Sequence, residues 1–123
     1  MNLASPATRS VANAGPVVLR GDVDGTALLS LNRPERRNTL SEAMLASLSE
    51  IFSSIAADGR IRAVVISANG PAFSAGHDLK EITQHRKDAD GGRAYVKDIM
   101  QKCSALMQSI MRLPQPVIAA VEG

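Results

Sequence analysis

The stretch "NGPAFSAGHDLKEI", residues 69–82, joins an apolar run to a charged segment and decides how the chain folds. Gly70 and Pro71 predict a turn, and Gly76 supplies a second position where the backbone can take a positive φ. The first N–H groups of the helix that follows lack intrahelical partners and attract an oxygen that carries negative charge. Two interpretations remain. The N–H of His77 faces a ligand carbonyl, or the segment is an ordinary turn in which Asp78 only favours the helix start.

Outward from this stretch, hydrophobic periodicity and turn residues predict strands that alternate with helices. In chain order we expect a hairpin over 17–32, a helix over 41–57, a strand over 63–67, a short helix from near Asp78, a long helix over 95–113 and a strand over 117–121. Continuous β-branched runs suit strands that are buried on both faces. This order predicts an α/β fold in which the last two strands pair in parallel.

The predicted helix over 95–113 has apolar residues three and four positions apart, which is typical of a helix with one buried face. Cys103 lies on this face, so we interpret it as a small buried hydrophobic residue rather than a nucleophile. Three methionines share the face and are predicted to belong to the core: Met100, Met107 and Met111.

Length, composition and net charge argue against several classes of function. A length of 123 residues allows one domain, and an aromatic content of 2% with a net charge of +2 argues against a nucleic-acid partner. The chain has one cysteine and no apolar run long enough to span a membrane, so we expect a reducing compartment and no membrane partner. The acid-free residues 1–16 are interpreted as a flexible leader. We expect the cytoplasm of a bacterium, with mitochondrial targeting as the alternative.

Three segments in this order resemble the crotonase, or enoyl-CoA hydratase/isomerase, family: "LNRPERRNTLS" at 31–41, "AFSAGHDLKE" at 72–81 and "PQPVIAAVEG" at 114–123. The resemblance runs from residue 17 to residue 123. The segment "HDLKE" is most similar to the corresponding segment of the branch called enoyl-CoA hydratase domain-containing proteins. It implies the N-terminal portion of a crotonase (ClpP-like) ββα superhelix, truncated before the segment that carries the second oxyanion donor.

The resemblance also implies a site. An acyl-CoA thioester would place its carbonyl in an oxyanion hole whose first donor is the backbone N–H of His77. Whether the imidazole of His77 takes part in acid/base chemistry stays open, and Thr39 replaces a more usual Ala. Arg36 and Arg37 either meet CoA phosphates or form a solvated basic turn. The residues assigned to substrate and CoA binding are Arg36, Arg37, Thr39, Leu40, Ser74, Gly76, His77, Asp78, Leu79 and Lys80.

The function that the resemblance implies is hydration of a trans-2-enoyl-CoA by a parent enzyme that forms trimers or hexamers. No metal and no cofactor are expected, apart from coenzyme A as part of the substrate. The family's acid/base glutamates come after the segments matched here, so we expect the chain alone to be inactive as a hydratase. The alternative is a non-catalytic CoA-binding or interaction protein that pairs with a full-length relative.

Overall fold

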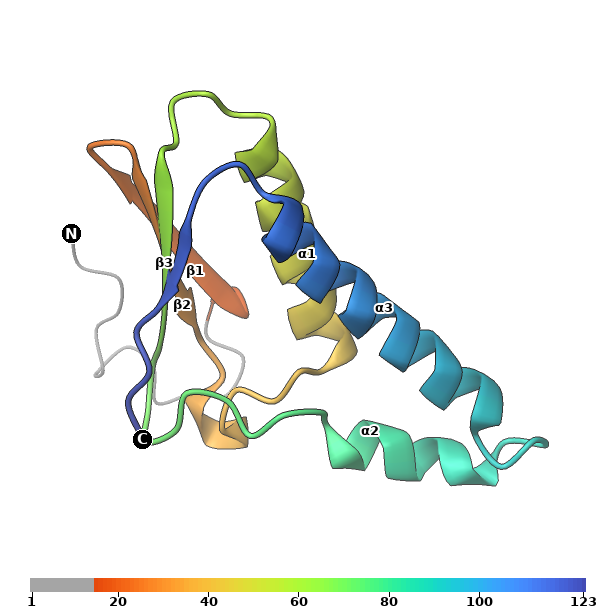
Figure 1. Cartoon of the computed structure of the whole chain (residues 1–123). Coiled ribbons are helices and arrows are strands. Elements are labelled where there is room, and N and C mark those ends of the chain that lie inside the picture. The colour runs from red at the N-terminus through yellow and green to blue at the C-terminus, as the bar shows by residue number, and fades with distance from the viewer. Residues whose placement is uncertain (1–14) are drawn as a thin grey trace.

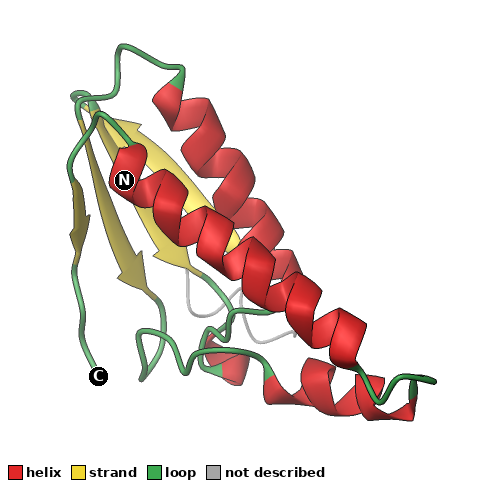
Figure 2. Ribbon diagram, turned by 45° about the vertical axis from the view of Figure 1, so that its right-hand side comes forward, coloured by secondary structure: helices red, strands yellow, loops and turns green. Residues whose placement is uncertain are grey.

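The computed structural model describes residues 15–123, so nearly all of the predicted leader lies outside the described residues. The chain forms a four-stranded sheet of order β1-β2-β3-β4, and helices α1 and α3 lie on one side of it (Figures 1 and 2). The elements are β1 (Val18–Val23), β2 (Thr26–Leu31), η2 (Pro34–Arg36), α1 (Glu42–Ala56), β3 (Ala63–Ala68), α2 (Leu79–Gln84), η3 (His85–Lys87), α3 (Arg93–Arg112) and β4 (Val117–Ala119).

The hairpin and the parallel strands confirm the sequence predictions. β1 and β2 are antiparallel and are joined by Asp24 and Gly25, with φ of 51° and 81°. Positive φ at both positions is what a two-residue hairpin turn of matching twist requires. β2 pairs in parallel with β3, and β3 pairs in parallel with β4. The last strand is shorter than the predicted span of 117–121.

Helix α1 supplies more buried apolar residues to the core than either of the other described α-helices. The Ser41 hydroxyl accepts a hydrogen bond from the N–H of Met44 at 3.1 Å, which caps the helix at the first residue of the predicted span of 41–57. The apolar face of α1 packs with the sheet residues that point toward it. The fully or nearly fully buried members of this core include Ala27, Leu29, Met44, Leu45, Leu48, Phe52, Ile55 and Val64.

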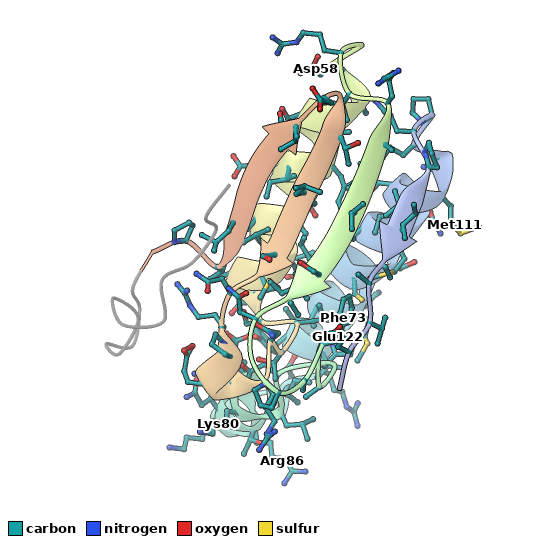
Figure 3. The ribbon with its side chains drawn as sticks, turned by 90° about the vertical axis from the view of Figure 1, so that its left-hand side faces the viewer. Asp58, Phe73, Lys80, Arg86, Met111 and Glu122 are labelled. Carbon is teal, nitrogen blue, oxygen red and sulfur yellow. The ribbon has the colours of Figure 1, made fainter. Side chains whose placement is uncertain are left out.

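Burial of the two parallel strands was predicted wrongly. Of the β3 residues only Val64 is buried, and Ile118 of β4 is 55% exposed. The reason is visible in Figure 3, where the face of the sheet turned away from α1 and α3 carries no helix of the described chain. Two-sided burial of a strand needs a layer on each face. The described residues form one such layer only.

The prediction that the α3 methionines are core residues is also wrong. Met100, Met107 and Met111 are 43%, 42% and 84% exposed, and Cys103 is half-buried. α3 lies against α1, and its buried residues are Ile99 and Leu106. The apolar stripe of α3 is therefore wider than the surface that α1 covers.

A helical arm connects β3 to α3. α2 and η3 run away from the sheet, and the chain reverses at Gly91 and Gly92 to enter α3 (Figure 1). The rings of His85 and Tyr95 stack with centroids 3.6 Å apart, which holds the outgoing and returning segments together. The start of this arm, at the carboxyl end of β3, is where the candidate site lies.

Candidate functional site

Two loops meet where β2 and β3 end. The parallel register pairs Leu31 with Ala68, so the next residues of both strands leave the sheet side by side. Asn69 donates a side-chain hydrogen bond to the side chain of Asn32 at 3.0 Å, at the start of this contact. The sheet therefore brings the turn over 33–40 against the loop over 69–78. Ligands of open α/β sheets commonly bind at this edge.

Close backbone packing and hydrogen bonds fix the loop on the turn. Gly70 has φ of 93°, and a Cβ added to it would lie 2.5 Å from the Cβ of Pro34. Further along, Ala75 donates its N–H to the carbonyl of Arg37 at 2.9 Å. Only glycine fits at position 70 because both the space and the backbone conformation exclude a side chain. The loop is thus held at each end.

One hydrogen bond sets the direction of the His77 N–H. The carbonyl of Gly76 accepts from the N–H of Leu40 at 2.7 Å, in an isolated parallel bridge between Leu40 and His77. The carbonyl of Gly76 and the N–H of His77 belong to one trans peptide, so they point in opposite directions. The N–H of His77 therefore points away from the turn, and no residue among 15–123 accepts a hydrogen bond from it.

Glycine is favoured at position 76 by the backbone conformation there and not by a lack of room for a side chain. Its φ is 88°, which confirms the predicted positive φ, and a Cβ added there would meet nothing within 4 Å. A side chain at this position would be strained by the backbone rather than by a neighbour. The space on the Cβ side of Gly76 is therefore open.

Asp78 organises the start of α2. Its carboxylate accepts from the N–H groups of Lys80 and Glu81 at 3.0 and 3.2 Å. It also accepts from the guanidinium of Arg36 at 2.7 Å and from the hydroxyl of Thr39 at 3.1 Å. Burial alone would raise the pKa of Asp78, but these donors outweigh it and hold the pKa below its ordinary value.

The Asp78 contacts correct part of the sequence interpretation. We expected unsatisfied N–H groups at the helix start to attract the oxygen of a ligand, but the side chain of Asp78 occupies them. The capping role considered for Asp78 as the simpler alternative is therefore present. The candidate donor is instead the loop N–H of His77, which precedes the helix and whose direction depends on Leu40 rather than on a helix dipole.

The imidazole of His77 is partly buried beside its own N–H. Its Nδ1 atom is buried and has no hydrogen-bond partner among the described residues. A buried ring nitrogen without a partner is unfavourable, and a polar ligand atom in reach of it would remove that cost. The acid/base role considered for this side chain stays a prediction.

A cavity of about 350 Å³ lies between the turn over 33–40 and the loop over 69–78, and His77 is one of its lining residues. It is within the size range of small-molecule sites. Three cationic side chains, Arg36, Arg37 and Lys80, lie on its wall beside Glu35. Its lining residues are Glu35, Arg36, Arg37, Thr39, Ala75, His77, Asp78, Leu79 and Lys80. A neighbouring cavity of about 490 Å³ shares Arg36, Thr39 and Asp78 with it.

The structure thus brings most of the predicted site residues together. Leu40, Ser74 and Gly76 do not line the 350 Å³ cavity, and they act on the loop backbone instead. The Ser74 hydroxyl donates to the carbonyl of Asn38 at 2.8 Å and accepts from the N–H of Gly76 at 3.2 Å. Sequence reasoning missed Asn38 and Glu35. Asparagine tolerates a positive φ in turns, which was the available signal for Asn38.

Two absences concern residues 15–123 only. In that part of the chain, no group of three or more His, Cys, Asp or Glu side chains could hold a metal ion. No helix among the described residues combines the length and apolar character needed to cross a membrane.

The family of this chain follows from its similarity to known proteins. Residues 22–123 match the family described as Enoyl-CoA hydratase/isomerase, and the chain belongs to that family. The matched structures carry the crotonase fold, of which the described residues form a part. The predicted resemblance and fold class are thereby confirmed.

The chain is similar to several particular members of this family. Human enoyl-CoA hydratase domain-containing protein 3, mitochondrial, is 43% identical over 101 residues, which cover 82% of this chain and 32% of the relative. The mouse mitochondrial delta(3,5)-delta(2,4)-dienoyl-CoA isomerase is 36% identical over 100 residues, 77% of this chain and 31% of the relative. An enoyl-CoA hydratase structure from Mycobacterium smegmatis superposes with a TM-score of 0.79 at 47% identity, covering 89% of this chain and 41% of that one. The chain therefore spans about a third of the length of these curated relatives.

Proposed function

We propose that the chain is the acyl-CoA-binding part of an enoyl-CoA hydratase/isomerase enzyme and that its His77 N–H donates to the thioester carbonyl. The observation that carries this proposal is the Gly76–His77 peptide. Its carbonyl is held by Leu40 and its N–H has no acceptor among residues 15–123, beside a cavity of about 350 Å³. A fixed donor that has no acceptor among residues 15–123 suits an oxygen that gains negative charge in the reaction.

The charges around the cavity support a CoA ligand. Arg37 and Lys80 are exposed, and Arg36 keeps 46% of its side chain exposed while one nitrogen contacts Asp78. Guanidinium and ammonium groups bind phosphates through charge-assisted hydrogen bonds. Leu79 is 72% exposed at the same place and offers an apolar contact for the neutral arm of coenzyme A. The interpretation of the arginines as a solvated turn is the competing one.

The parent reaction that we propose is hydration of a trans-2-enoyl-CoA. Hydration needs a group that activates water and a group that protonates the enolate. Asp78 is unsuited because four donors occupy its carboxylate and lower its pKa. Glu35 is the other carboxylate on the cavity wall, and it lies on an exposed turn. We therefore expect the 123 residues alone to show no hydration above background.

A second candidate function has one observation in its favour. The exposed side of α3 carries Met100, Met107 and Met111, an apolar surface that suits contact with other polypeptide. A non-catalytic CoA-binding protein that pairs with a full-length relative is therefore the alternative, and trimers or hexamers are proposed for the full-length form. The names of the human and mouse relatives include the word mitochondrial, which supports a mitochondrial location for this protein. The other proposal is the cytoplasm of a bacterium.

Calorimetric titration tests the leading proposal. We expect butyryl-CoA to bind the chain and Arg37→Gln to weaken binding about three- to tenfold, because a charge-assisted contact is lost. Lys97→Gln is the matched control, since Lys97 is an exposed cation outside the cavity. Equal losses of affinity in both variants would show that butyryl-CoA is attracted by the net charge of the chain alone. Absence of binding by the wild type would refute the proposal, and a mixed complex with a full-length relative in light scattering would favour the alternative.

A further inference from the structure

Asn38 is a polar side chain that is fully buried beside the site. It is 0% exposed, and all of its side-chain contacts go to backbone groups. Its Oδ1 accepts from the N–H of Arg33 at 2.7 Å, and its Nδ2 donates to the carbonyls of Asn69 at 2.9 Å and Ala72 at 3.1 Å. The side chain thus ties the turn over 33–40 to the loop over 69–78.

The backbone of Asn38 continues this connection to the candidate donor. Its carbonyl accepts from the Ser74 hydroxyl at 2.8 Å, and the same hydroxyl accepts from the N–H of Gly76 at 3.2 Å. Gly76 is the residue whose carbonyl shares a peptide plane with the N–H of His77. A line of hydrogen bonds therefore runs from Asn38 through Ser74 to the Ala75–Gly76 peptide, which directly precedes the Gly76–His77 peptide.

The backbone conformation at Asn38 places the two flanking hydrogen bonds. Arg37 and Asn38 have φ of 53° and 52°, so the chain turns back on itself between them. This turn presents the Arg37 carbonyl to the N–H of Ala75 and the Leu40 N–H to the carbonyl of Gly76. Asparagine adopts this conformation more readily than most residues, and its buried side chain stabilises it here.

We propose that Asn38 is the positioning residue of the oxyanion donor: it holds the Gly76–His77 peptide in the orientation that points the His77 N–H away from the turn over 33–40 and leaves it free to bind a ligand oxygen. This inference rests on the proposed function for the identity of the ligand, but not for the geometry of the loop. Asn38 does not line the cavity, so it acts through the loop rather than on the substrate.

Two variants remove the side-chain connection without forcing the backbone out of its conformation. Asn38→Gly keeps the positive φ and deletes the side chain, and Asn38→Asp keeps the shape but replaces the donor to two carbonyls by an acceptor. The matched control is Gln115→Leu. The amide of Gln115 donates to the carbonyls of Ile55 and Ile61 at 2.9 and 3.1 Å, at the Asp58 end of the sheet, opposite to Lys80 (Figure 3). This control lowers stability but does not touch the loop.

The first measurement needs no ligand. Amide hydrogen exchange of Ala75 and Leu40, whose N–H groups flank the peptide, should be about tenfold to a hundredfold faster in both Asn38 variants than in Gln115→Leu, because the loop opens locally. The comparison is made at matched global stability, measured by urea unfolding of each variant. Exchange rates equal to those of the control would overturn the inference.

The second measurement uses butyryl-CoA and its thioether analogue S-butyl-CoA, which lacks only the carbonyl oxygen. The wild type and Gln115→Leu should prefer the thioester about three- to tenfold, the equivalent of one hydrogen bond, and both Asn38 variants should lose the preference. A preference retained in both Asn38 variants overturns the inference. If the wild type shows no preference while the exchange result holds, the positioning by Asn38 stands and the proposed function fails.

Discussion

Replacing Asp78 by Asn tests how the site is held together. The buried carboxylate has three roles: it caps α2, accepts from Thr39 and pairs with Arg36 at 2.7 Å. Asparagine caps a helix about as well as aspartate, so this change keeps the cap and removes the charge. Asp78→Asn therefore isolates the ion pair from the other two roles.

The size of the effect follows from burial. The Asp78 side chain is 3% exposed and that of Arg36 is 46% exposed. A charge-assisted hydrogen bond contributes about 1.5–3 kcal/mol when buried and an exposed pair about 0–1 kcal/mol, so we expect Asp78→Asn to lower the free energy of unfolding by about 1–2 kcal/mol. Asp78→Ala also removes the cap, which raises the expected loss to about 2–4 kcal/mol.

Urea unfolding followed by circular dichroism measures both losses, and the pH dependence identifies their origin. The pKa of Asp78 is lower in the folded chain than in the unfolded one, so its contribution is complete above the ordinary pKa and disappears as the pH falls through the lowered value. The difference between wild type and Asp78→Asn should therefore vanish in acid. The control Asp22→Asn removes an exposed pair with Arg20 and should change little. A loss for Asp78→Asn that is no larger than this control, or that persists unchanged in acid, refutes the reasoning.

Three further predictions concern other positions. Gly70→Ala should lower the urea midpoint more than Gly76→Ala. Both residues have positive φ, which alone costs about 1–2 kcal/mol for alanine, but only a Cβ at position 70 would clash with Pro34. Equal midpoints for the two variants would contradict this prediction. Gln115→Leu leaves the carbonyls of Ile55 and Ile61 without their donor and should cost about 1–3 kcal/mol by urea unfolding. Hydrogen bonds from the side chain and backbone of Arg60 hold the pKa of Asp58 at about 2, so Arg60→Gln should raise it toward its ordinary value in a carboxyl titration by NMR.

Several features of the fold could be predicted from sequence because they depend on short stretches. The pair Asp24-Gly25 encodes the hairpin turn, and Ser41 with the apolar spacing after it encodes α1. The parallel pairing of β3 with β4 follows from a strand, a helical crossover and a second strand. The failed predictions concern burial, at β3 and on α3, because an apolar residue is buried only if another layer covers it. Periodicity shows which side of an element is apolar and does not show what lies against it.

Some features of the candidate site likewise depend on local sequence, and others depend on tertiary contacts. The sequence by itself determined the glycine with positive φ before His77, the helix start at Asp78 and the cluster of arginines near residue 36. Only the tertiary structure decided that the Asp78 carboxylate meets Arg36 and Thr39, and that Leu40 fixes the direction of the Gly76–His77 peptide. The physical reason is the register of β2 and β3. These contacts join residues far apart in the chain, and they form only because two parallel strands end side by side.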